Sequence, residues 1–382
     1  MVYKTFGKTG LKLSVLGFGA MRLPMTEKDG KPIVDYEKAV PLMRRAFELG
    51  VNYIDTAPYY CESDSEVAVG KALKGWRDKV YLSTKNPIED ASGANFRKRL
   101  ENSLKKLDTD YIDFYHMWGI NLESFRSSID VKNGPVEAAR KAIDEGLIKH
   151  LSFSFHDKPE NMIPIIDSGY FSSVLCQYNL LDRSNEENMA YANEKGLGVV
   201  VMGPVGGGSL GAPSEVIRNM IKKEVKSTAE MALRFVLSNS HTNMALSGME
   251  DLRMLEENVK VAAVEGVLTS DEYGQVNAIL AEKKRLSELY CTGCRYCMPC
   301  PAGLNIPHIF KLMNNHKVYE LTAHSKREYK ALFTPVEERH VWAKPNGVSA
   351  DKCVECGQCE EKCPQKLSIM KQLKETHTVL GK

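Results

Sequence analysis

The sequence predicts an α/β protein in which a (β/α)8 barrel is followed by a small, mainly α-helical domain rich in cysteine. Two observations carry this prediction. Short apolar runs alternate with amphipathic stretches of helical length over roughly 250 residues, as a (β/α)8 TIM barrel requires. Closely spaced cysteines then fill the last quarter of the 382-residue chain. We therefore expect the barrel over residues 1–265, a connecting helix over 266–288 and the second domain over 289–382.

The barrel strands are expected where β-branched and aromatic residues form short apolar runs. These runs lie at residues 15–21, 52–57, 80–85, 111–118, 150–155, 173–179, 197–203 and 243–248. A stretch with helical apolar spacing follows each run, and several stretches stop at Gly or Asn, which favour a helix C-terminus. The expected helices cover residues 35–50, 65–76, 94–107, 135–146, 159–169, 184–196, 227–239 and 251–262.

Three further segments complete the expected fold. The opening KTFGKTGLKL (4–13) is typical of a short hairpin that closes the floor of the barrel. Residues 268–286 begin with Thr269 and Glu272 in the spacing of a capping box, which predicts a helix leaving the barrel. Residues 306–323 have helical apolar spacing, so the cysteine-rich domain is expected to be mainly helical.

The two cysteine runs have the spacing of iron–sulfur ligands. The second run is Cys-x2-Cys-x2-Cys-x3-Cys-Pro, a bacterial ferredoxin spacing, and the first is one residue shorter before its last cysteine. Zinc sites usually pair two Cys-x2-Cys units across a longer gap, so the runs favour iron–sulfur, with zinc as the alternative. The candidate ligands are Cys291, Cys294, Cys297, Cys300, Cys353, Cys356, Cys359 and Cys363.

A crossed ligand assignment follows from the ferredoxin spacing. In two-cluster ferredoxins, the fourth cysteine of each run binds the other cluster. We therefore expect two [4Fe–4S] clusters, although the shortened first run leaves room for one cluster only. The Cys-Pro pair and the helix after it resemble helical, ferredoxin-like iron–sulfur domains. The expected sets are Cys291, Cys294, Cys297 and Cys363 for one cluster, and Cys300, Cys353, Cys356 and Cys359 for the other.

The barrel carries a candidate catalytic set at the ends of its strands, where active sites of such barrels lie. Asp55 ends the second expected strand, Lys85 ends the third, and Tyr60 follows Asp55 by five residues. A buried ammonium stabilises a neighbouring phenolate, and a carboxylate beside the lysine keeps that lysine charged. The set predicts a tyrosine that hands a proton to a developing alkoxide. The alternative is an ordinary interior ion pair beside a loop tyrosine.

This ordered set resembles the active site of the aldo–keto reductase family, and the likeness extends over most of residues 1–265. It also rests on residues 3–24, 198–210 and 245–259, which resemble the family's opening, seventh strand and last strand with its helix. The resemblance implies NADP or NAD across the barrel mouth and a small-molecule carbonyl or alcohol as substrate. The implied cofactor-binding residues are Ser154, Gln177, Gly203, Ser247, Gly248, Arg253 and Asn258.

The sequence departs from the family pattern in the fourth strand. The family's histidine slot, five residues after Asp113, holds Trp118, and His116 lies two residues earlier. His116 is then either an orienting donor that reaches the site or a core histidine that fills a barrel layer. Phe155 stands where the family usually has Asn, and Trp118 and Phe155 together suggest bulky walls around a cyclic or aromatic substrate.

The main functional hypothesis is an NAD(P)-dependent oxidoreductase that interconverts a carbonyl and an alcohol. Tyr60 donates the proton, Lys85 tunes its pKa, Asp55 holds the lysine and His116 assists. Hydride transfer from nicotinamide needs no metal, so the clusters either relay single electrons or hold a small domain together. Two alternatives remain: an electron-transfer protein that links nicotinamide to a redox partner protein, and a nucleotide-binding redox sensor.

Composition excludes several other classes of partner. The net charge is +2 and basic residues are interspersed with acidic ones, so no nucleic-acid surface is expected. No apolar run reaches the roughly 18 residues needed to span a bilayer, and the N-terminus has no apolar leader, so no membrane partner is expected. We therefore expect a cytoplasmic protein, in a reducing compartment where clustered cysteines are more often metal ligands than disulfides.

Overall fold

The computed structural model of the protein describes residues 1–264, 267–288, 291, 293–334 and 347–382. The chain forms two compact units. The first, called the barrel unit, comprises Met1–Gly207 and Ala232–Leu268. The second, called the cysteine unit, comprises Gly208–Met231 and Thr269–Lys382.

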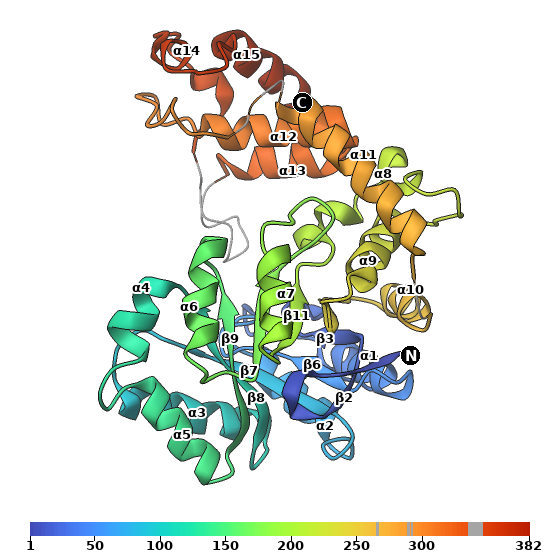
Figure 1. The fold of residues 1–382 in the computed structure, drawn as a ribbon, viewed down its shortest axis with the longest axis vertical. Coiled ribbons are helices and arrows are strands. Elements are labelled where there is room, and N and C mark those ends of the chain that lie inside the picture. The colour runs from blue at the N-terminus through green and yellow to red at the C-terminus, as the bar shows by residue number, and fades with distance from the viewer. Residues whose placement is uncertain (265–266, 289–290, 292, 335–346) are drawn as a thin grey trace. The chain divides into compact units, whose positions relative to one another are not determined.

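Eight parallel strands close the barrel, as the sequence predicts (Figure 1). Each of the eight expected apolar runs contains or overlaps one of them. Around the barrel the order is β10, β11, β12, β3, β6, β7, β8 and β9. Their bounds are β3 (Leu16–Gly19), β6 (Tyr53–Asp55), β7 (Tyr81–Pro87), β8 (Ile112–Ile120), β9 (Ile148–Phe155), β10 (Ser173–Gln177), β11 (Gly198–Met202) and β12 (Met244–Ser247).

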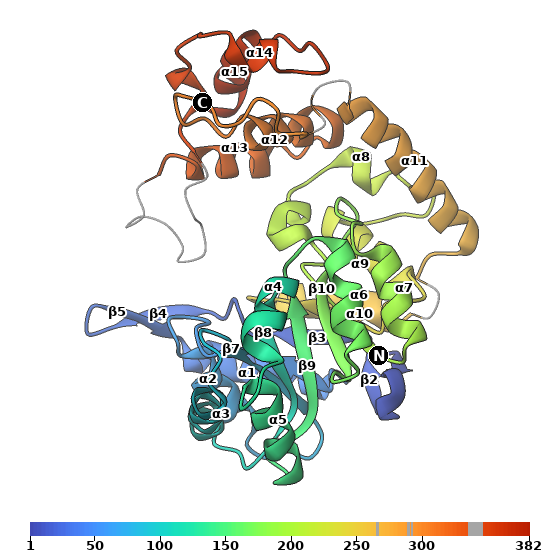
Figure 2. The ribbon, with the colours of Figure 1, turned by 60° about the vertical axis from the view of Figure 1, so that its left-hand side comes forward.

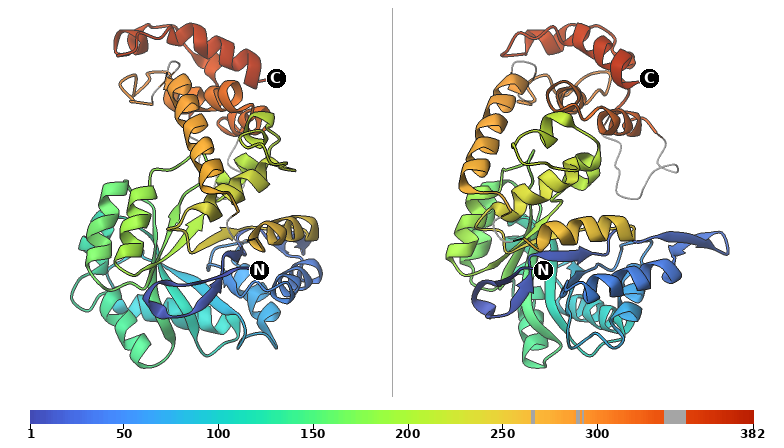
Figure 3. Two further views of the ribbon diagram at one scale, coloured as in Figure 1. Left: turned by 45° about the vertical axis from the view of Figure 1, so that its right-hand side comes forward. Right: turned by 90° about the vertical axis from the view of Figure 1, so that its right-hand side faces the viewer.

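Helices follow the strands along the chain and surround the barrel (Figure 3). The eight expected helices are all present, and short helical segments also lie between them, among them α4 (Leu122–Ser124), a π-helical turn (Phe125–Ile129) and α8 (Glu215–Arg218). The eight are α1 (Tyr36–Glu48), α2 (Ser65–Leu73), α3 (Gly93–Leu107), α5 (Pro135–Asp144), α6 (Met162–Asp167), α7 (Glu186–Glu194), α9 (Thr228–Ser238) and α10 (Leu252–Ala262).

The expected N-terminal hairpin is formed by β1 (Tyr3–Thr5) and β2 (Lys12–Ser14), which pair antiparallel. Phe6 and Leu13 from this hairpin are fully buried in a cluster with the strand residues Tyr53 and Phe114. The Phe6 and Phe114 rings meet edge to face at 5.2 Å. The hairpin therefore fills the interior at one end of the barrel, which agrees with its predicted place at the floor.

A second hairpin, β4 (Met25–Lys28) with β5 (Lys31–Val34), was not predicted. Figure 2 shows it extending away from the barrel. Its two-residue turn is Asp29-Gly30, and both residues have positive φ, 51° and 73°. Asp-Gly is a strong signal for such a turn, so this hairpin was detectable from the sequence.

The cysteine unit is mainly helical, as predicted, and has no β-strand within the described residues. Its helices are α11 (Ser270–Glu288), α12 (Ile306–Tyr319), α13 (Thr322–Ala331), α14 (Gln358–Glu361) and α15 (Ile369–Leu380), together with α8. The expected capping box of α11 is present: Thr269 N–H donates to Glu272, and Glu272 N–H donates to the Thr269 hydroxyl. Of the helices in the described residues, none is long and apolar enough to cross a membrane.

A segment between β11 and α9 folds with the cysteine unit. Within Gly208–Met231, the Ser214 hydroxyl donates a 2.6 Å hydrogen bond to the Tyr319 carbonyl at the end of α12. The Ser214 N–H donates to the Thr228 hydroxyl at 2.8 Å. The expected boundary at 265/266 and residue 289 lie outside the described residues, so the three-part division stays a prediction.

Candidate active site and metal centre

A buried ion pair lies at the centre of the candidate active site. The Lys85 ammonium donates to Asp55 Oδ2 at 2.5 Å and to the Thr56 carbonyl at 2.7 Å. Ser83 donates to the other Asp55 oxygen at 2.7 Å. Burial alone would lower the pKa of Lys85, but Asp55 and then Tyr60 raise it above its ordinary value. Lys85 is therefore fixed in place and charged.

The structure brings Tyr60 to this pair. Its ring is nine-tenths buried, and the Lys85 ammonium lies 4.7 Å from the ring centroid. Burial raises the pKa of Tyr60 above its ordinary value, and the Lys85 charge offsets part of that rise. The expected effect of Lys85 is present, but burial outweighs it. The phenol is consequently protonated at neutral pH, as a proton donor must be.

A left-handed turn follows Tyr60 directly. Cys61, Glu62 and Ser63 all have positive φ, at 50°, 54° and 69°. Such backbone is costly for residues other than glycine and persists where the surroundings impose it. Here the Lys106 ammonium donates to the Ser63 carbonyl at 3.2 Å. The turn directs the chain so that Tyr60 faces inward, and no sequence signal for it is evident.

His116 lies beside the ion pair but deep in the wall. It stands opposite Lys85 in the register between β7 and β8, and its side chain is fully buried. Neither ring nitrogen has a hydrogen-bond partner among the described residues. Burial lowers the pKa of His116 to about 4, so the ring is neutral at neutral pH. Its assisting role stays a prediction.

Aromatic side chains line the mouth next to Tyr60. The Trp118 ring meets Tyr60 edge to face at 5.7 Å and lies 5.6 Å from Tyr59. Trp118 therefore fits its expected place as a wall. Phe155 alternates with Ser154 along β9 and is expected on the same strand face as Phe153.

The Phe153 ring packs with aromatic residues outside the barrel strands. Phe153 packs against Phe171 at 4.8 Å, and Phe171 in turn packs against Phe125 of the outer helical turn. Phe155 is 2% exposed. It is therefore a buried residue, and its expected place as a wall of the substrate pocket stays a prediction.

The expected cofactor residues of β9, β10 and β11 lie at the same end of the barrel as Tyr60. Ser154 accepts a 2.7 Å hydrogen bond from the Gly119 N–H. The Gln177 amide packs on Gly203, where a Cβ would lie only 2.6 Å from it. Gly203 has φ of 62°, so glycine is required there for both conformation and space.

The remaining cofactor candidates follow β12. Asn258 of α10 donates to the Ser247 hydroxyl at 3.2 Å, and Gly248 comes directly after Ser247. Arg253 is highly exposed and pairs with Glu257 one turn along the same helix at 3.2 Å. The structure thus joins Ser247 with Asn258, while Arg253 pairs with Glu257 on the helix surface. Cofactor binding by all seven residues stays a prediction.

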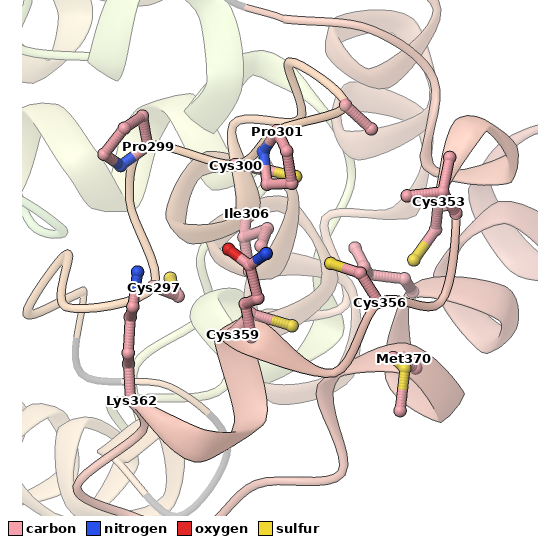
Figure 4. A pocket seen from close by; sticks show the side chains of 14 residues that line it. Cys297, Pro299, Cys300, Pro301, Ile306, Cys353, Cys356, Cys359, Lys362 and Met370 are labelled. Carbon is pink, nitrogen blue, oxygen red and sulfur yellow. The ribbon is translucent and has the colours of Figure 1, made fainter.

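The eight cysteines of the cysteine unit surround two cavities. The first is lined by Cys297 and Cys300 from the first run and by Cys353, Cys356 and Cys359 from the second (Figure 4). This cavity thus combines cysteines of both runs. No three His, Cys, Asp or Glu side chains in the described part of the chain converge as a site for a single metal ion.

The second cavity has the reciprocal arrangement. It is lined by Cys291, Cys294 and Cys297 of the first run and by Cys363 of the second. Each cavity is lined by at least the four cysteines that a [4Fe–4S] cluster takes as donors, so the residues present fit that group. Cys297 and Ile306 line both cavities, which places the two sites next to each other.

Comparison with known families identifies both parts of the chain. The protein belongs to the aldo/keto reductase family, whose model matches residues 15–281. A 4Fe-4S dicluster domain model matches residues 290–368. The protein is thus an oxidoreductase of this family with a C-terminal iron–sulfur domain, as the sequence patterns indicate.

Individual relatives cover the barrel. L-galactose dehydrogenase of Arabidopsis thaliana is 29% identical over 317 residues, covering 74% of this chain and 96% of that protein. Among solved structures, an aldo-keto reductase from Bacillus halodurans in its holo form is 29% identical with a TM-score of 0.63, covering 73% of this chain and 96% of its own. An aldo-keto reductase from Klebsiella pneumoniae in complex with NADPH is 25% identical with a TM-score of 0.60, at the same coverage.

Proposed function

We propose that the barrel unit interconverts a small-molecule carbonyl and its alcohol, with a nicotinamide dinucleotide as the second substrate. The observation that carries the proposal is the Asp55–Lys85 pair beside the buried, protonated Tyr60. In the reductive direction, one hydride joins the carbonyl carbon and one proton joins its oxygen. The nicotinamide, when bound, supplies the hydride; the chain supplies the proton.

Each residue of the set has a separate task. Tyr60 gives its phenol proton to the substrate oxygen as negative charge develops there. Lys85 stabilises the phenolate that remains until solvent returns the proton. Asp55 keeps Lys85 charged and in position through the 2.5 Å contact. Neutral His116 would assist by orienting polar groups in the same layer rather than by carrying charge.

The proposed cofactor is NADP or NAD, bound along the ends of β9 to β12. The likeness to a Klebsiella pneumoniae reductase in complex with NADPH supports this class of cofactor. Ser154, Gln177 and Gly203 would hold one part of it, and Ser247, Gly248, Arg253 and Asn258 the other. The aromatic wall of Tyr59, Tyr60 and Trp118 favours a cyclic or aromatic carbonyl.

Two neighbouring tyrosines provide a matched test. Tyr60→Phe should lower NADPH-dependent reduction of 4-nitrobenzaldehyde about 1,000-fold, because a proton donor contributes roughly 100- to 10,000-fold. Tyr59→Phe removes the hydroxyl of the neighbouring tyrosine, which donates to Glu89 at 2.7 Å. This variant should keep a rate near that of the wild type. Near wild-type activity in Tyr60→Phe would refute the proposal.

For the cysteine unit, we propose two [4Fe–4S] clusters with crossed ligands, in a cytoplasmic protein. Cys291, Cys294, Cys297 and Cys363 would hold one, and Cys300, Cys353, Cys356 and Cys359 the other. Such clusters, when bound, supply one-electron transfer and metal-coupled stability.

Iron counting tests the crossed assignment. Anaerobically purified wild type should hold about eight irons per chain, and Cys300→Ser or Cys363→Ser should each lose up to about four. Cys176→Ser, which changes a fully buried barrel thiol, is the control and should keep the full count. Four irons in the wild type would leave a single cluster, and zinc in place of iron would refute the assignment.

A second candidate function is electron transfer to a redox partner protein. The observation that favours it is the adjacency of the two cavities, which share Cys297 and Ile306. In that case NADPH should bleach the visible iron–sulfur absorbance, and Tyr60→Phe should not prevent the bleaching. Clusters that stay oxidised with NADPH bound would leave carbonyl reduction as the function of the barrel.

A further inference from the structure

His156 lies at the mouth of the barrel, directly after the last residue of β9. The backbone N–H of His156 donates to the Ile120 carbonyl at the end of β8, at 3.3 Å. Its imidazole lies over Gly119, because a Cβ built on Gly119 would be 3.9 Å from the ring's Cδ2. Gly119 in turn follows Trp118, whose ring contacts Tyr60. The ring of His156 thus belongs to the same rim as the candidate proton donor.

The backbone that carries His156 is anchored on both sides. Ser154 accepts the Gly119 N–H two residues before it. Asp157, the next residue, accepts the Leu122 N–H at 3.0 Å and the Asn161 amide at 2.8 Å. The backbone position of His156 is therefore set by the ends of β8 and β9.

The electrostatic surroundings connect this ring with the catalytic ion pair. His156 is exposed to solvent, yet partial burial of its ring lowers the pKa, and the charge of Lys85 lowers it further. The ring is neutral at neutral pH and lies within range of the Lys85 charge. A neutral imidazole carries one N–H donor that can bond a carbonyl oxygen.

The rings of His156 and His116 differ in their accessibility to a ligand. His116 is fully enclosed in the wall. No hydrogen bond joins the ring nitrogens of His156 to another side chain or carbonyl in the described residues, and the ring has open surface. Of these two histidines close to Lys85, a substrate entering the mouth meets His156.

We propose that His156 is a catalytic residue that hydrogen-bonds the reacting oxygen of the substrate alongside Tyr60. The inference rests on the proposed carbonyl–alcohol chemistry of the barrel. The ring N–H of His156 donates a hydrogen bond to the substrate oxygen, and this hydrogen bond becomes stronger as negative charge develops on the oxygen. The transferred proton comes from Tyr60. The substrate oxygen therefore has two donors, one from the loop after β6 and one from the end of β9.

Substitution of His156 tests the proposal by kinetics. His156→Phe should lower kcat/KM for 4-nitrobenzaldehyde about 100-fold, the usual loss when one donor to a developing oxyanion is removed. His156→Gln and His156→Asn place an amide N–H near one or other ring nitrogen, and one of them should recover part of the loss. His241→Phe, at the opposite, N-terminal end of the strands just before β12, is the control and should leave kcat/KM unchanged.

Ligand binding provides a readout without turnover. With NADPH present, 4-nitrobenzyl alcohol forms a dead-end complex, which its effect on NADPH fluorescence can follow. His156→Phe should weaken alcohol binding about tenfold, the effect of a lost hydrogen bond of roughly 1.4 kcal/mol, and leave NADPH affinity unchanged. If His156→Phe does not fold, the Gln and Asn variants carry the same comparison.

The outcomes separate this inference from the proposed function. Wild-type kcat/KM and alcohol binding in all folded His156 variants, with Tyr60→Phe inactive, would overturn the role of His156 alone. A fully active Tyr60→Phe would overturn the carbonyl chemistry on which it rests. Equal weakening of NADPH and alcohol binding in His156→Phe would assign the residue to the cofactor and also overturn the inference.

Discussion

The two units differ in whether the polar side chains of their candidate sites have partners within the protein. In the barrel unit, Asp55, Lys85 and Ser83 are buried and satisfied by one another at 2.5 to 2.7 Å. In the cysteine unit, thiols such as Cys294 and Cys356 are exposed, and the cavities they line have no internal partner for them among the described residues. The barrel site is thus complete from its own side chains, whereas the cysteine unit is arranged around a ligand.

The hydrophobic cores of the two units also differ. The barrel encloses its site within eight strands and their covering helices. The cysteine unit has a smaller apolar cluster, centred on Ile309 and Phe310 of α12 and Leu373 of α15, and the cysteines pack at its edge. Small domains often depend on metal for stability. We therefore expect the barrel to keep its fold without clusters and the cysteine unit to lose it.

The largest expected effect comes from removing the clusters. Anaerobic chelation and oxidation should make the cysteine unit sensitive to protease, because metal-coupled folding free energy is then lost. The segment Gly208–Met231 should become sensitive with it, since it belongs to the same unit. Limited proteolysis followed by mass spectrometry measures both.

NADPH binding to the cluster-free protein is the accompanying control. It should stay close to the wild-type value, because the expected cofactor residues belong to the barrel unit. A cysteine unit that resists protease after complete iron loss would contradict the contrast between the two units.

Breaking the barrel's ion pair should have the next largest effect. Lys85→Met leaves Asp55 buried without its partner, which should lower the free energy of unfolding by about 3–5 kcal/mol. The pKa of Tyr60 should rise further, because the charge that offsets its burial is gone. Denaturant unfolding and the pH profile of reduction measure the two effects.

The exposed ion pair of Lys74 and Asp108 supplies the control. Lys74→Met should cost at most about 1 kcal/mol, as exposed pairs do. Equal losses in Lys74→Met and Lys85→Met would mean that the barrel site is not a prearranged, buried pair.

The smallest expected effect concerns acid stability of the barrel. The pKa of His116 is about 4 in the folded protein, below the ordinary value of about 6.5. The unfolded chain therefore binds the proton first as pH falls through this window, and the free energy of unfolding decreases between about pH 6.5 and 4, by up to about 3 kcal/mol. His116→Leu should reduce that decrease.

Denaturant titrations at several pH values measure how the free energy of unfolding changes with pH. His241→Leu, outside the barrel wall, is the control and should leave the slope unchanged. The account of His116 as a buried neutral group would be wrong if His116→Leu and the wild type lost stability in parallel over that range.

Periodicity and motif spacing anticipated most of the fold and the central site. All eight barrel strands and the set of Asp55, Tyr60 and Lys85 were predicted because strand ends of a closed barrel converge. Cysteines of both runs line each of the two cavities, and the crossed ligand assignment stays a prediction. The strands and the motif spacings can be recognised from residues that are close together in the sequence.

Features that depend on distant contacts were not anticipated. The membership of Gly208–Met231 in the cysteine unit depends on Ser214 meeting Tyr319, which are far apart in sequence. The net rise in the pKa of Tyr60 reflects burial by the complete barrel. The β4–β5 hairpin was missed although its Asp-Gly turn was visible.

The most direct test follows the hydrogen itself. Anaerobically purified protein is supplied with NADPH deuterated at the transferable position of nicotinamide C4 and with 4-nitrobenzaldehyde, and the alcohol is analysed by mass spectrometry. The account predicts one deuterium on the carbinol carbon, with clusters present or removed, and product formed about 1,000-fold more slowly in Tyr60→Phe. Product without deuterium, formed only when the clusters are present, would mean that electrons reach the substrate through iron and sulfur and would contradict a tyrosine-centred hydride transfer.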